Sequence, residues 1–109
     1  MVDGLITING KQYFLKYDMN ILCEMKMDGF DAFELMNGEM TVDFIKLRTF
    51  FFYGLKLIQS SVVKTKEDAG ELMSRYLESE GTIEELTEVA MKALARSLGY
   101  KQMDAPEGK

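Results

Sequence analysis

Histidine is absent from the 109 residues of this chain, and cysteine and proline occur once each, as Cys23 and Pro106. Without histidine the chain lacks the commonest general base, the commonest zinc ligand and the usual activator of a serine or cysteine nucleophile. A single cysteine cannot form an internal disulfide, which favours a reducing compartment. These absences argue against an enzyme, and we expect no catalytic residue, metal or cofactor.

Long apolar runs and concentrated positive charge are also missing. No stretch reaches the roughly 18 uncharged apolar residues that span a membrane, so we expect no membrane span. The opening residues carry an acid and no basic region, so we expect no secretory signal. Acids outnumber lysines and arginines by 18 to 13. The only basic block, residues 41–64, is weakly charged, so we expect no nucleic-acid partner.

The composition is that of a soluble globular protein, with 47% apolar and 28% charged residues. A chain of 12.5 kDa is long enough for one domain and too short for two. Surface scaling indicates that about two-thirds of its surface can be buried, so its core needs neither disulfides nor metal. We expect a single domain over residues 1–99 and a loose tail at 100–109.

A β-hairpin is expected at residues 5–17. Asn9-Gly10 is the preferred pair for a type I′ turn, because both residues tolerate a positive φ. A two-residue turn places Ile8 opposite Lys11, and the period of two then gathers the large apolar residues on one face. That face holds Ile6, Ile8, Tyr13, Leu15 and Tyr17. A lone hairpin is marginal in water, so it must lie against helices or pair with another chain.

Capping residues and apolar spacing predict the helices that follow. They are expected at about 19–27, 31–36, 42–59, 66–79 and 83–98, with Asp18, Thr41, Thr65 and Thr82 as N-caps of all but the second. Cys23 is interpreted as a small buried hydrophobe. Phe30, Phe33 and Met36 are expected to point inward. The expected fold class is therefore α+β, a short N-terminal β-hairpin followed by a bundle of four to five α-helices.

The phenylalanine-rich helix at about 42–59 has more apolar residues than one core stripe requires. The expected core stripe consists of Phe44, Leu47, Phe51, Leu55 and Ile58. Phe50, Tyr53 and Leu57 form a second stripe at i, i+3 and i+7, so they are candidate protein-binding residues for a client or for self-association. Burial in the core is the alternative for Phe50 and Tyr53. The exposed edge of the hairpin is a second candidate surface.

The order of these elements supports a resemblance to a known family. A hairpin with the sequence ITINGKQY at residues 6–13 leads into a capped helix, and a helix containing LRTFFFYGLK at 47–56 comes next. Two more capped helices follow and end at Leu98-Gly99. Over residues 5–99 the chain resembles the small tail assembly chaperones of long-tailed, siphophage-type bacteriophages and prophages.

The resemblance implies a partner and a place of action. Such chaperones bind the helix-forming tape measure protein in the host bacterial cytoplasm, keep it soluble, and promote polymerisation of the tail tube around it. They are not expected in the mature virion. Further implied partners are the tail tube protein, a frameshifted longer form of the same protein, and other copies of the chain. The alternatives are a tail or neck component retained in the virion, or a small acidic protein-binding regulator.

Overall fold

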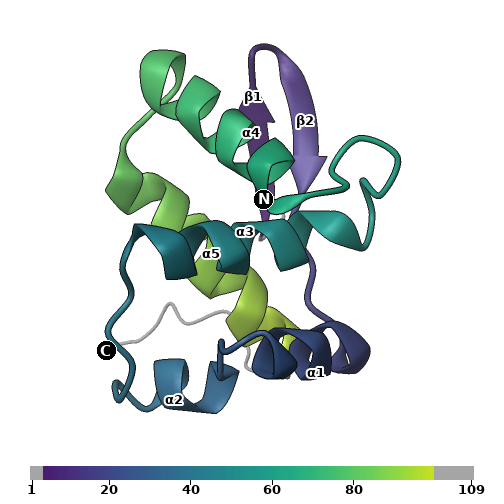
Figure 1. Cartoon of the computed structure of the whole chain (residues 1–109). Helices are drawn as coiled ribbons and strands as arrows, with labels where there is room; N and C mark the ends of the chain where they lie inside the picture. The colour runs from purple at the N-terminus through teal and green to yellow at the C-terminus, as the bar shows by residue number, and fades with distance from the viewer. Residues whose placement is uncertain (1–3, 100–109) are drawn as a thin grey trace.

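In the computed structural model, which describes residues 4–99, an N-terminal β-hairpin is followed by five helices. The elements are β1 (Leu5–Ile8), β2 (Lys11–Phe14), α1 (Met19–Met27), α2 (Ala32–Met36), α3 (Phe44–Lys56), α4 (Lys66–Ser79) and α5 (Ile83–Ser97). Helix α3 crosses the middle of the molecule, with the hairpin and α4 on one side and α1 and α2 on the other (Figure 1). The predicted α+β class is confirmed. The predicted tail at 100–109 lies outside the described residues.

The hairpin forms with the expected turn and register. Ile8 pairs with Lys11 and Ile6 with Tyr13. Asn9 and Gly10 have φ angles of 53° and 79°, as a type I′ turn requires. All five side chains expected on the inner face of the hairpin and the segment that follows it are buried. The local turn chemistry therefore determines which face of the hairpin enters the core.

The outer edge of the hairpin on the β2 side is hydrogen-bonded, at Phe14 and just after it, to the turn and helix that adjoin it. The Gln59 side chain accepts a 2.7 Å hydrogen bond from the Phe14 N–H and donates one of 3.2 Å to the Phe14 carbonyl oxygen. The N–H of Lys16 donates to the carbonyl oxygen of Gly54 at 2.9 Å. An added strand would have to displace these bonds, so this edge is a poor site for strand addition.

Side-chain caps begin the helices where the sequence indicates, with one exception. Asp18 accepts from the N–H of Ile21 at 2.8 Å, and Thr65 and Thr82 form complete capping boxes with the helical residues three positions on. The predicted Thr41 cap is wrong. Asp43 is the N-cap of α3 and accepts from the N–H of Lys46, which places a carboxylate at the positive end of the helix.

Helix α3 buries almost its whole circumference rather than one stripe. Every residue from 49 to 55 is buried. In the predicted core stripe, Leu47, Phe51 and Leu55 are buried, whereas Phe44 and Ile58 are exposed. Phe44 begins the helix and Ile58 follows its end. A helical wheel gives the direction of a side chain, but it cannot show whether another element packs at that height along the axis.

Among the helices of residues 4–99, none is both long enough and apolar enough to cross a membrane.

Candidate functional site

The structure places two of the three predicted binding residues in the core. Phe50 is 1% exposed and Tyr53 is 8% exposed, whereas Leu57 is partly exposed just after α3. The rings of Tyr17 and Phe30 lie 5.1 and 4.9 Å from the ring of Phe50 and cover it. Of the two alternatives left open for Phe50 and Tyr53, the structure shows burial in the core. The three residues do not form one surface in the folded chain.

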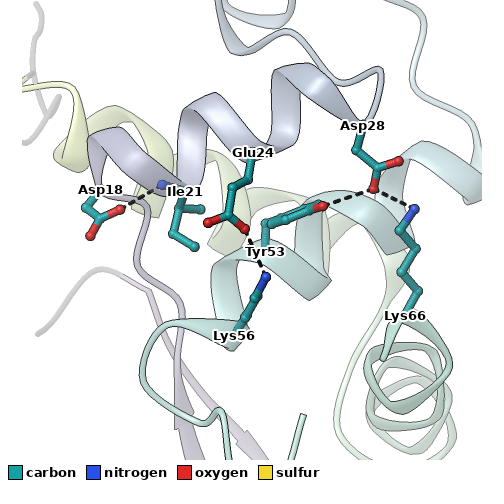
Figure 2. A network of polar contacts seen from close by, with 7 residues as sticks. All are labelled: Asp18, Ile21, Glu24, Asp28, Tyr53, Lys56 and Lys66. Atoms are coloured by element: carbon teal, nitrogen blue, oxygen red, sulfur yellow. Dashed lines mark hydrogen bonds and ion pairs between the residues drawn. The ribbon is translucent and has the colours of Figure 1, made fainter. Parts of the chain in front are cut away.

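Tyr53 is covered by a network of polar contacts that joins three helices (Figure 2). Its hydroxyl donates a 3.1 Å hydrogen bond to Asp28 Oδ2, and Lys66 Nζ lies 2.6 Å from the same oxygen. One turn along α1, Glu24 Oε1 accepts from Lys56 Nζ at 2.9 Å, and that ammonium lies over the Tyr53 ring. Burial and the hydrogen bond to Asp28 raise the pKa of Tyr53 to about 12. This side of α3 is therefore occupied by contacts within the chain.

Exposed apolar side chains gather instead in a groove on α1 and α2. The groove encloses about 420 Å³, and its apolar lining includes Met19, Leu22, Cys23, Met27, Phe33 and Leu98. Met19, Met27 and Phe33 are 69%, 87% and 74% exposed. Large apolar side chains that are this exposed and this close together mark an interaction surface. We call this feature the α1–α2 groove.

Local sequence explains why these side chains point outward. Ile21 and Met25, four residues apart, bury one face of α1. Met19, Cys23 and Met27 recur at intervals of four on another face. The expected apolar stripe of α1 followed Ile21, whereas the spacing of Met19, Cys23 and Met27 is the sequence signal for this second, exposed face. The prediction that Cys23 is buried is wrong, since it is exposed.

The turn between α1 and α2 decides which phenylalanine enters the core. Gly29 has a φ of +92° and lets the chain reverse after α1. Phe30, directly after this turn, is buried against Phe50. Asp31 then caps α2 by accepting from the N–H of Phe33, which fixes Phe33 in the first turn and outside the core. The prediction that Phe33 points inward is therefore wrong.

Charges at the groove are predominantly acidic. Lys26 Nζ forms an ion pair with Asp31 Oδ2 at 3.0 Å, and both residues line the groove. The hydrogen bond to Asp31 and the nearby charge of Glu34 raise the pKa of Lys26. Glu34, whose negative charge also acts on Lys26, is a second acid beside this pair. The groove thus combines a wall of methionine and phenylalanine with a small excess of negative charge.

The groove offers contact area rather than reactive groups. Its polar lining groups are the Lys26–Asp31 pair, and Cys23 supplies the only thiol. Within residues 4–99, no group of three or more metal-binding side chains is arranged to hold an ion. Comparison with known proteins finds no matching protein family, no similar curated protein and no similar solved structure.

Proposed function

We propose that this protein is a phage tail assembly chaperone that binds the tape measure protein, keeps it soluble and promotes tail tube polymerisation around it. The observation that carries the proposal is the α1–α2 groove, in whose lining Met19, Met27 and Phe33 are largely exposed. The resemblance over residues 5–99 supplies the identity of the client. The protein would act in the host bacterial cytoplasm, without catalytic residues or a cofactor.

The physical task of such a chaperone suits a groove of this composition. A long helical client exposes apolar surface that must be covered reversibly until tube subunits replace the chaperone. Methionine side chains are flexible and polarisable, so they adapt to successive segments of a client that differ in detail. A groove of this size covers only one short segment, so many copies would coat a long client. Each copy could then be displaced individually as the tube advances.

The experiment that tests the proposal is co-expression with the tape measure protein from the same genome. We expect the tape measure protein to move into the soluble fraction and to co-purify with this protein. Phe33→Ser should lose both effects, whereas Phe44→Ser, which changes a phenylalanine of similar exposure outside the groove lining, should keep them. An insoluble tape measure protein in the presence of the unaltered chain would contradict the proposal.

Two further measurements separate the chaperone from the other classes and define its assemblies. Mass spectrometry of purified virions should not detect the protein, and a high copy number would instead indicate a tail or neck component. Light scattering after gel filtration will determine whether the chain forms a homo-oligomer. The same co-purification will show whether the tail tube protein and any frameshifted longer form of the chain join the complex.

A further inference from the structure

The strongest clue to what binds in the α1–α2 groove is the charge around it. Of the six acids in residues 18–39, Glu24 and Asp28 pair with lysines of other elements, and Asp31 pairs with Lys26. Glu34, whose charge acts on Lys26, forms no ion pair with another residue of the described part of the chain. The negative charge of Glu34 therefore remains beside the groove after the ion pairs are counted.

We propose that the α1–α2 groove binds an amphipathic helix whose apolar face is flanked by lysine or arginine side chains. The assignment of this helix to a tape measure protein rests on the proposed function, but the binding chemistry does not. The apolar face would cover Met19, Met27 and Phe33. The basic flanks would lie near Glu34, where opposite charge favours association and fixes orientation.

The dimensions of the groove suit one helix. Met19 and Met27 are eight residues apart on α1, so they are separated by about 12 Å along its axis. A bound helix presents apolar side chains at i, i+3 or i+4, and i+7 over about 10 Å, which matches that length. Phe33 of α2 supplies the rigid aromatic contact, and the two methionines supply the adaptable ones.

The same charges argue against two other occupants. A second copy of this chain related by a two-fold axis would bring its own acidic groove against this one, because the same patch faces itself in such a dimer. Like charges then oppose each other across the contact. An anionic membrane surface is disfavoured for the same reason, since membrane-binding faces are rich in lysine and arginine. An amphipathic helix with basic flanks can pack against the apolar wall and place opposite charges beside the acidic residues.

Cys23 makes the proposal directly testable, because it lines the groove, is exposed and is the only thiol in the chain. The probe is a model peptide of about 18 residues in which leucines occupy one helical face and lysines the other. One comparison peptide replaces every lysine with glutamate, and another keeps the composition but scrambles the leucine positions. Affinity is measured by fluorescence anisotropy, and site occupancy by the rate at which a thiol reagent modifies Cys23.

We expect the lysine peptide to bind and, at saturation, to slow Cys23 modification by about tenfold or more, whereas the glutamate and scrambled peptides bind at least about tenfold more weakly. Phe33→Ser should lower the affinity for the lysine peptide by about tenfold, and Phe44→Ser should leave that affinity unchanged. Glu34→Lys should lower the affinity for the lysine peptide and raise the affinity for the glutamate peptide. Circular dichroism of each variant establishes that it is folded.

Equal affinity for the lysine and glutamate peptides, or binding that leaves Cys23 modification unchanged, would overturn the inference. Failure of both the lysine peptide and the glutamate peptide to bind would overturn the inference as well. The outcomes remain distinct from those of the proposed function. Peptide binding without rescue of the tape measure protein contradicts the chaperone role alone, whereas rescue that survives Phe33→Ser contradicts the groove assignment alone.

Discussion

The hydroxyl of Tyr17 donates a 2.7 Å hydrogen bond to the carbonyl oxygen of Phe50, in the middle of helix α3. Both side chains are buried, and their ring centroids are 5.1 Å apart. This contact holds the segment after the hairpin against α3. It is possible only because Gly54, one turn further along, has no side chain: a Cβ there would lie 2.5 Å from the Tyr17 hydroxyl oxygen.

Replacing Gly54 with alanine is expected to destabilise the protein despite the better helix propensity of alanine. The added Cβ would lie 2.7 Å from Tyr17 Cζ and 2.9 Å from Leu15 Cδ2, both in the packed core. Overpacking of this kind costs about 1–3 kcal/mol, which exceeds the gain of about 1 kcal/mol from propensity. Urea unfolding measures the change in the free energy of unfolding.

Gly70→Ala is the matched control for Gly54→Ala, since both glycines lie inside helices. A Cβ at Gly70 would meet only the Arg48 side chain, with Cδ at 3.2 Å and Cγ at 3.8 Å, and that side chain is flexible. We expect Gly70→Ala to be neutral or to stabilise the protein by up to about 1 kcal/mol. Similar effects of the two substitutions would contradict the role assigned to the Tyr17 contact.

Raising the pH above 10 is expected to destabilise the protein through its buried tyrosines. Burial raises the pKa of Tyr17 well above the ordinary value of 10, and burial together with Asp28 raises the pKa of Tyr53 to about 12. Above pH 10 the unfolded chain releases these protons while the folded chain keeps them, so the free energy of unfolding falls as the pH rises. The two tyrosines contribute fully to the free energy of unfolding below pH 10. The contribution of Tyr53 is lost between pH 10 and about 12.

Urea midpoints measured across this pH window test the prediction. Tyr53→Phe should flatten the decline, because the substituted ring has no proton to lose. An equally steep decline in the wild type and in Tyr53→Phe would show that other groups cause it.

Gln59→Glu is expected to be destabilising although the two side chains have nearly the same shape. The amide Nε2 donates to the carbonyl oxygens of Phe14 and Leu55, at 3.2 and 2.6 Å. A carboxylate would face both oxygens with negative charge and no donor. We expect a loss of about 1–3 kcal/mol at neutral pH, recovered in part when the carboxyl is protonated.

Hydrogen exchange provides a second readout for Gln59→Glu. The Phe14 N–H donates to Gln59 Oε1, so its exchange should become faster if the side chain no longer holds its place. Ser61→Ala, on the exposed turn beside it, should change stability by less than about 0.5 kcal/mol. An unchanged free energy of unfolding for Gln59→Glu at neutral pH would contradict this prediction, because it would show that the turn rearranges with no loss of stability.

Two neighbouring phenylalanines are expected to respond in opposite ways to substitution. Phe30→Ala should cost about 3–5 kcal/mol, because its buried ring stacks on Phe50 at 4.9 Å. Phe33→Ser should change stability by no more than about 0.5 kcal/mol, because its ring is exposed in the α1–α2 groove. Thermal unfolding of the isolated protein measures both. A large loss for Phe33→Ser would indicate a structural rather than a binding role.

Features that depend on neighbours a few positions away could be predicted from the amino-acid sequence alone. The Asn9-Gly10 turn, the hairpin register and the caps at Asp18, Thr65 and Thr82 were all predictable. Each arises from bonds or backbone preferences within about four residues, so no knowledge of the rest of the chain is needed. The inward face of the hairpin followed from the same local register.

Which apolar residues are buried and which form the groove depends on contacts between distant parts of the chain. Phe50 and Tyr53 are covered by Tyr17, Phe30 and Asp28, which lie 20 to 33 residues earlier in the chain than the residue each contacts. Helical spacing shows on which side of its helix Phe50 lies. It does not show which side of the helix packs against a neighbouring element. Cys23 and Phe33 have the polarity of core residues and are exposed because nothing in the described chain packs over them. Burial is a property of long-range contacts, whereas capping and turn formation are local.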